Sequence, residues 1–194
     1  FPISLENDGA TAALGELLTG QGENYKTFFH IYMGNGLGGG YMLDGKLMRG
    51  GNGNAAELGH MIRSPNKRPT LRNLAESLKR PQGDISSAEI EAMFVAKDPE
   101  FMDWLDDAIA NLGTAMNAVS ILMDPHAIVI GGRFPSSVTR YIIDNLHIES
   151  YGENFSMVKR PVIIPAKTLG ADAVTYGAAA LPLYKYLLIS STNV

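Results

Sequence analysis

The chain has 194 residues, of which 45% are hydrophobic and 19% are charged, a balance typical of a packed globular protein rather than a disordered one. Its formal net charge of −4 argues against a nucleic-acid-binding surface, and the absence of cysteine excludes disulfides and thiolate metal sites. Because no apolar run reaches the length of a membrane span, we expect a cytoplasmic protein that contacts neither a membrane nor nucleic acid.

The first residues of the chain predict a strand that leads into a helix. Phe1–Leu5 reads as a strand that enters in mid-fold, without an initiator methionine, so we expect a fragment or a processed product. Ala10–Leu18 has a helical composition, and Asn7 or Asp8 would make a good N-cap. Capping is one interpretation of these two side chains. The other is catalysis, because Asp8 lies at a strand-to-helix junction, where α/β folds place functional groups.

A glycine-dense turn, Gly34–Gly40, follows the strand-like run Thr27–Met33. Glycines at this density let backbone N–H groups approach a ligand, and successive N–H groups form an anion-binding nest. The alternative is that these glycines only make tight turns and bulges. The spacing matches neither the dinucleotide fingerprint nor a Walker A loop, so two common nucleotide-binding modes lose support.

The residues after this turn predict a hairpin and then two polar side chains. The hairpin consists of two short strands and a tight turn, predicted at Tyr41–Leu43, Lys46–Met48 and Asp44-Gly45. A second glycine-rich turn, Gly50–Gly53, leads to Glu57 and His60. Glycine turns beside hydrogen-bonding side chains are typical of a site for phosphate and sugar groups.

The rest of the chain alternates helices and strands. Further helices are predicted at Thr70–Leu78, Ser86–Ala96, Pro99–Met123, Pro135–Leu146 and Ala173–Leu188. Glu89 follows Ser86 at capping-box spacing, and Pro182 should kink or break the last helix. Strands are predicted at Ala127–Ile130, which ends on Gly131-Gly132, and at Val162–Ile164. This alternation predicts an α/β fold, and its order favours one lobe of an actin-like ATPase (ribonuclease H-like) fold over a Rossmann domain.

The chain carries a series of short motifs whose order is more specific than any one of them. In the first third they are Leu5–Asp8 with Ala12-Ala13, Gly34–Gly40, Asp44–Leu47, Arg49-Gly50 and Asn54–Met61. Later they are Asp124–Gly132, Leu169–Ala171 and Gly177–Ala179. This series resembles the ROK family, which comprises repressors, open reading frames and sugar kinases. The resemblance covers nearly the whole chain and implies an actin-like sugar kinase fold with hexose or amino-sugar ligands.

The resemblance also implies roles for the polar residues. Asp8 corresponds to the catalytic base that takes the proton from the sugar hydroxyl as it attacks the γ-phosphate. Asn7 would hydrogen-bond a sugar hydroxyl. Glu57 and His60 would accept from and donate to further hydroxyls, and such paired contacts give sugar specificity.

The nucleotide would bind to the two glycine turns that follow the predicted strands. By the resemblance, the turn Gly34-Asn35-Gly36 would face the phosphates of ATP, and Gly131 and Gly132 would border the adenosine. Mg²⁺ would arrive with ATP, because the chain offers no firm ligand set of its own. The resemblance further implies a homodimer.

Four features depart from the family pattern. The family's zinc module joins a histidine to three cysteines. Because this chain has no cysteine, His60 cannot belong to such a module, and we predict that no zinc binds. Asn35 stands where kinases commonly have threonine. Arg133 stands where a small residue is common, and such a cation would either cover the adenosine site or bind phosphate. The amino-terminal lobe is expected to be missing, so residues 1–194 would form a single carboxy-terminal lobe that is inactive alone.

Two functions compete on this basis. An ATP-dependent sugar kinase rests on Asp8 and the glycine turns, and it is the leading hypothesis. The alternative is the ligand-sensing and dimerising domain of a sugar-responsive transcriptional repressor, which Asn35, Arg133 and the lost cysteine loop favour. A lobe that only mediates oligomers is a third interpretation. Sequence upstream of Phe1 would separate them, because a helix-turn-helix there favours the repressor and the Asp-x-Gly-Gly-Thr loop favours the kinase.

Overall fold

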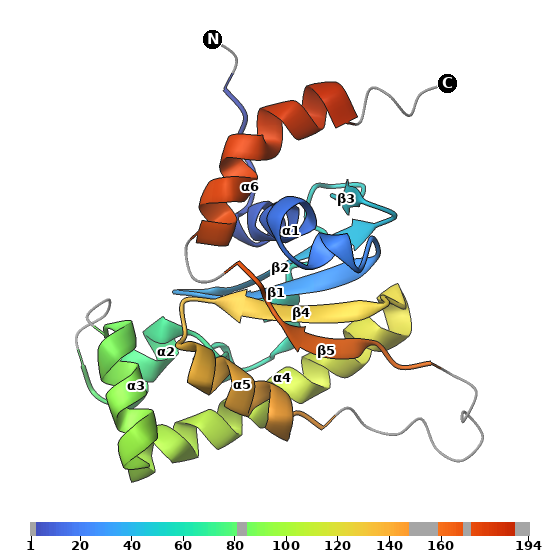
Figure 1. Cartoon of the computed structure of the whole chain (residues 1–194). Helices are drawn as coiled ribbons and strands as arrows, with labels where there is room; N and C mark the ends of the chain where they lie inside the picture. The colour runs from blue at the N-terminus through green and yellow to red at the C-terminus, as the bar shows by residue number, and fades with distance from the viewer. Residues whose placement is uncertain (1–2, 81–84, 148–158, 169–171, 189–194) are drawn as a thin grey trace.

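The computed structural model describes residues 3–80, 85–147, 159–168 and 172–188. Its centre is one five-stranded sheet with the strand order β3-β2-β1-β4-β5 (Figure 1). The strands are β1 (Phe28–Met33), β2 (Leu37–Leu43), β3 (Lys46–Met48), β4 (Ala127–Gly132) and β5 (Val162–Pro165). β1, β4 and β5 run parallel, whereas β2 is antiparallel to both of its neighbours. The sheet is therefore mixed, with the predicted hairpin at one edge.

Helices cover both faces of this sheet. α1 (Asp8–Thr19) and α6 (Asp172–Leu183) pack against each other on one face (Figure 1). The other face carries α2 (Leu71–Ser77), α3 (Ser87–Ala96), α4 (Pro99–Met123) and α5 (Ser136–Asn145). Strands and helices alternate as expected, which confirms the α/β class. Within the described ranges, none of the helices combines the length and the apolar character needed to cross a membrane.

The two faces of the sheet bury alternate residues of the same strands. In β1, the side chains of Phe29, Ile31 and Met33 belong to the larger core, which α4 and α5 close. Phe28 belongs to the smaller core beneath α1 and α6. Because both faces are covered, every residue of β1 is buried, including His30, and the strand has no exposed polar position.

Side-chain caps begin the helices where the sequence predicts them. The Asn7 side chain accepts from two N–H groups at the start of α1, so its predicted capping role is confirmed. Ser86 and Glu89 form the predicted capping box of α3. α4 has the predicted bounds, since it begins at Pro99 and ends before Asp124, which adopts a left-handed conformation with φ 42°.

The predicted glycine-dense turn is wrong in its extent. Only Gly34–Gly36 forms a turn, and the next glycines belong to β2. Their role is packing. A Cβ added at Gly40 would lie 2.5 Å from the Cβ of Ala13, and one at Gly9 would lie 2.5 Å from the backbone nitrogen of Gly39. Bare backbone on both elements is what lets α1 pack so closely on β2.

The two ends of the described chain differ from their predictions. The expected closing helix ends at Leu183 and continues as a π-helical turn, Tyr184–Leu188. The change follows Pro182 directly, because proline removes one N–H donor from the helical ladder. Ile3–Leu5 is not a strand of the sheet, so that prediction is wrong, and the first two residues and the Leu169–Ala171 motif lie outside the described residues.

Candidate functional site

The two predicted glycine turns follow the carboxyl ends of β1 and β4. These strands are parallel neighbours, with Met33 opposite Gly132, so the turns that follow them lie side by side. The first turn is Gly34–Gly36, and the second begins at Arg133, whose N–H donates to the Met33 carbonyl at 2.8 Å. In an α/β sheet, this edge is where ligands bind.

The amino terminus of α1 brings two predicted sugar contacts together. The Asn7 Oδ1 accepts from the N–H groups of Gly9 and Ala10 at 2.8 and 3.4 Å. Its Nδ2 donates to Glu57 Oε1 at 3.4 Å, across fifty positions of sequence. Both side chains are exposed, so the free lone pairs of the Glu57 carboxylate face solvent and are available to a ligand.

Asp8 is the first residue of α1, and its carboxylate is exposed. Its Oδ1 accepts from the Gly9 N–H at 2.8 Å, and a Cβ added at Gly38 would lie 3.5 Å from the same oxygen. The carboxylate therefore lies between the helix start and β2, where the helix dipole stabilises its negative charge. Burial raises the pKa of the nearby Tyr32 phenol, the charge of Asp8 raises it further, and Arg133 lowers it.

His60 lies in the short 3₁₀ turn Leu58–Met61 and is exposed. Its backbone N–H donates to the Glu57 carbonyl at 3.1 Å. The described contacts place it beside Glu57 in the chain but join its ring to neither Asn7 nor Asp8. The described residues contain no group of three or more histidine, aspartate or glutamate side chains arranged for a metal ion, and the absence of zinc remains a prediction.

The turn Gly34–Gly36 is held from both sides. The Gly34 N–H donates to the Gly36 carbonyl at 2.9 Å, and the Gly34 carbonyl accepts from Leu71 N–H at 2.9 Å. The Gly34 N–H is therefore not available to an anion. The N–H groups of Asn35 and Gly36 have no acceptor in the described part of the chain, and both residues are exposed. An anion at this turn would bind to those two groups.

A pocket of about 250 Å³ opens at the end of β4, and the predicted Gly131 and Gly132 line it. Gly132 has φ 128°, and an added Cβ would lie 2.1 Å from the Met33 carbonyl oxygen, so this position requires glycine. An aromatic ring, hydroxyls and cations complete the wall, from Phe134, Ser136, Thr139, Arg140, Lys167 and Thr168. The helical residues among them escaped prediction because their sequence pattern is that of an ordinary amphipathic helix.

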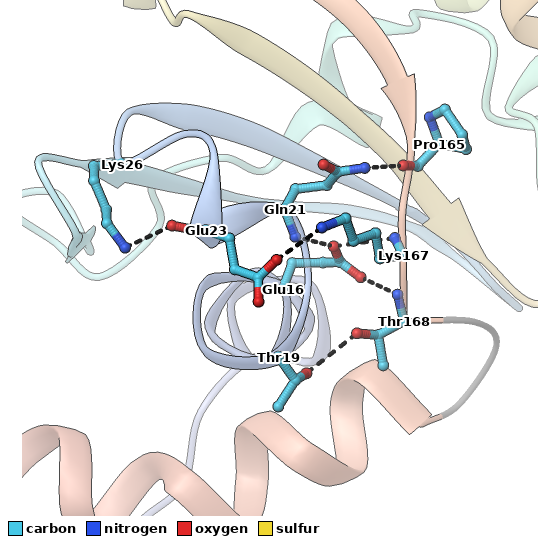
Figure 2. Close-up of polar contacts among 9 residues, drawn as sticks. Glu16, Thr19, Gln21, Glu23, Lys26, Pro165, Lys167 and Thr168 are labelled. Carbon is cyan, nitrogen blue, oxygen red and sulfur yellow. Dashed lines mark hydrogen bonds and ion pairs between the residues drawn. The ribbon is translucent and has the colours of Figure 1, made fainter.

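A buried carboxylate fixes the far wall of this pocket, and the sequence did not predict it. Glu16, near the carboxyl end of α1, has no exposed surface and accepts from three backbone N–H groups (Figure 2). The donors are Gln21, Lys167 and Thr168, at 3.0, 3.2 and 2.6 Å. The side-chain amide of Gln21 also donates, through Nε2, to the Pro165 carbonyl at 2.8 Å. α1 therefore carries Asp8 at one end and holds the residues after β5 at the other.

Comparison with known proteins agrees with this architecture. The ROK family model matches residues 1–184. A beta-glucoside kinase from Listeria monocytogenes serovar 1/2a is 31% identical over 167 residues, which are 78% of this chain and 57% of that kinase. A ROK hexokinase from Thermus thermophilus is 25% identical, with a TM-score of 0.68 and coverage of 95% of this chain and 67% of that one.

A regulator has the same fold as these kinases. The structure of a ROK family transcriptional regulator, a homologue of the E. coli MLC protein, is 23% identical, with a TM-score of 0.71, and covers 98% of this chain and 54% of the regulator. The chain spans about half the length of the curated relatives it matches. Together, the family match and the shared actin-like ATPase fold show that this chain belongs to the ROK family.

Proposed function

We propose that this chain is the sugar-binding lobe of an ATP-dependent kinase that acts on a hexose or an amino sugar. The observation that carries the proposal is the position of Asp8. Its exposed carboxylate lies at the start of α1, next to the hydrogen-bonded pair Asn7 and Glu57 and on the same sheet edge as the Gly34–Gly36 turn. A base, a sugar-binding pair and an anion-binding turn are the groups that phosphoryl transfer to a hydroxyl requires.

In this proposal the chemistry is divided among these groups. Asp8 accepts the proton of the sugar hydroxyl as the oxygen attacks the terminal phosphorus of ATP, and ADP leaves. The free lone pairs of Glu57 accept hydrogen bonds from other sugar hydroxyls, and Asn7 and His60 contribute to the same surface. Such contacts position the sugar, and positioning supplies much of the rate enhancement.

The nucleotide would occupy the neighbouring turn and pocket. The N–H groups of Asn35 and Gly36 would contact its phosphates, and the pocket beyond Gly131-Gly132 would receive the adenosine, whose ring suits Phe134. Mg²⁺ would bind with ATP, since the described residues offer no cluster for it. We also propose that a second lobe completes the ATP site and that the protein is a homodimer.

The similarity to a beta-glucoside kinase and to a ROK hexokinase supports a sugar substrate. The test is to incubate the full-length protein that the gene encodes with ATP, Mg²⁺ and a panel of hexoses, amino sugars and β-glucosides, and to measure ADP release. The proposal predicts sugar-dependent ADP release with at least one member. If no sugar raises ADP release above the sugar-free rate, the kinase proposal is wrong.

A second candidate is the ligand-sensing domain of a transcriptional repressor, because a ROK family regulator has this same fold over nearly the whole chain. This candidate predicts that a sugar binds without phosphoryl transfer and that binding changes the affinity of the full-length protein for DNA. Sugar titrations with and without a labelled promoter fragment distinguish it from the kinase.

A further inference from the structure

A cation lies beside the anion-binding turn. Arg133 follows Gly132 directly, and its N–H donates to the carbonyl of Met33, the last residue of β1. Only glycine fits at position 132 of this turn, because its φ is 128° and a Cβ there would overlap the Met33 carbonyl. The backbone therefore fixes Arg133 next to the residues that follow β1, which are Gly34–Gly36.

The Arg133 guanidinium has most of its donors free. One Nη donates to Asn35 Oδ1 at 3.4 Å, a long contact between exposed groups. Among the described residues, no carboxylate lies within 4.0 Å of this cation. Guanidinium carries five N–H donors in a planar fork that matches phosphate. Four of them have no acceptor in the described part of the chain and are open to a ligand.

The other polar groups at this turn are also donors. The Asn35 Oδ1 is directed to Arg133, so the Nδ2 of the same amide is left to donate elsewhere. The N–H groups of Asn35 and Gly36 add two more donors without described acceptors. Asp8 lies beside Gly38, where an added Cβ would be 3.5 Å from its Oδ1, and Gly38 pairs with Tyr32 of β1. The ring of Tyr32 lies 2.9 Å from where a Gly34 Cβ would be, so Asp8 and the turn lie near the same end of β1.

We propose that the Arg133 guanidinium and the Asn35 side chain, with the N–H groups of Asn35 and Gly36, bind a phosphate group near Asp8. The guanidinium fork would contact two phosphate oxygens, and its positive charge would offset the repulsion between that phosphate and the Asp8 carboxylate. The phosphate is either the terminal one of a nucleoside triphosphate or that of a sugar phosphate. The inference takes only the place of the phosphate from the proposed function and requires binding rather than turnover.

The test is calorimetric titration of the full-length protein and its Arg133→Ala variant at fixed ionic strength. The probes are AMPPNP, ADP, glucose 6-phosphate and glucose. We expect the variant to lose roughly tenfold to hundredfold in affinity for the phosphate-bearing probe and to keep its affinity for glucose. Arg133→Lys should recover part of the loss, because it restores the charge without the fork.

Arg160→Ala is the matched control, since Arg160 is exposed just before β5, at the opposite end of the strands from the site. It should leave every affinity unchanged. A selective loss for AMPPNP over ADP identifies the nucleotide as the source of the phosphate, and a selective loss for glucose 6-phosphate over glucose identifies the sugar phosphate. Equal affinities for Arg133→Ala and the parent, or equal losses in both arginine variants, would overturn the proposal.

The outcome separates this inference from the kinase proposal. If phosphate probes bind through Arg133 but no sugar is phosphorylated, the phosphate site stands and the kinase fails. If the protein phosphorylates a sugar and Arg133→Ala leaves both the KM for ATP and all affinities unchanged, the kinase stands and the phosphate site fails. Thermal unfolding of each variant confirms that the affinity changes do not come from loss of fold.

Discussion

His30 offers a direct test of burial at the centre of the sheet. It lies in the middle of β1, is fully buried, and neither ring nitrogen has a hydrogen-bond partner among the described residues. A Cβ added at Gly131 would lie 3.2 Å from its Nε2, which places the ring against the backbone of β4. Burial alone lowers the pKa of His30 from 6.5 to about 3, because the charged ring would lose its hydration.

The direction in which pH changes stability follows from the protonation of His30 in the folded and unfolded chains. Between pH 6.5 and about 3, the unfolded chain binds a proton at His30 that the folded chain does not. The free energy of unfolding therefore falls as the pH falls, by about 1.4 kcal/mol per pH unit well below 6.5. Integrated from pH 7 to pH 5, this one histidine removes about 2 kcal/mol of stability.

The His30→Leu variant removes both nitrogens at similar volume, so this loss should disappear. Urea unfolding of both proteins, followed through the fluorescence of the buried Trp104, measures the difference at pH 7, 6 and 5. As the pH falls from 7 to 5, we expect the free energy of unfolding of the variant to rise by about 2 kcal/mol relative to that of the parent. His126→Ala, at an exposed histidine, is the control and should track the parent. A constant gap between parent and His30→Leu across this range would refute the reasoning.

Two further changes test contacts that position the site. Glu16→Gln loses the carboxylate that three backbone N–H groups share, so the free energy of unfolding in urea should fall by about 1–3 kcal/mol and nucleotide binding should weaken. Glu23→Gln, at an exposed position, is the control and should change neither quantity. Gly40→Ala brings a Cβ to 2.5 Å from that of Ala13 and should lower the free energy of unfolding by about 1–3 kcal/mol. Gly51→Ala, whose Cβ would have no atom within 4 Å, should leave it unchanged. Equal effects of the two substitutions would contradict close packing of α1 on β2.

The elements with local signals could be predicted from the sequence. α4 has the bounds expected for it because a proline begins it and Asp124-Pro125 ends it. The caps at Asn7 and Ser86 were predictable for the same reason, since each cap bonds to N–H groups only a few residues away. These interactions act over one helical turn, and a short stretch of sequence contains all of the participants.

The site contacts that were missed join distant residues. Glu16 occupies an ordinary helical position in sequence, and its burial depends on N–H groups of Lys167 and Thr168 about 150 positions later. The Asn35–Arg133 contact spans 98 positions and depends on the register of β1 against β4. Glycine is ambiguous for another reason, because a sequence does not distinguish a residue needed for its φ, as at Gly132, from those needed for close packing.

The central claim is that Asp8 is the base in phosphoryl transfer to a sugar, and one variant tests it most directly. Asp8→Asn keeps the size of the side chain and an oxygen that accepts from the Gly9 N–H, so the fold and sugar binding should persist. With the best sugar of the panel, we predict that kcat falls by about 10²–10⁴-fold while the sugar Kd, from calorimetry, changes only slightly. A variant that keeps the parent kcat would contradict the role assigned to Asp8.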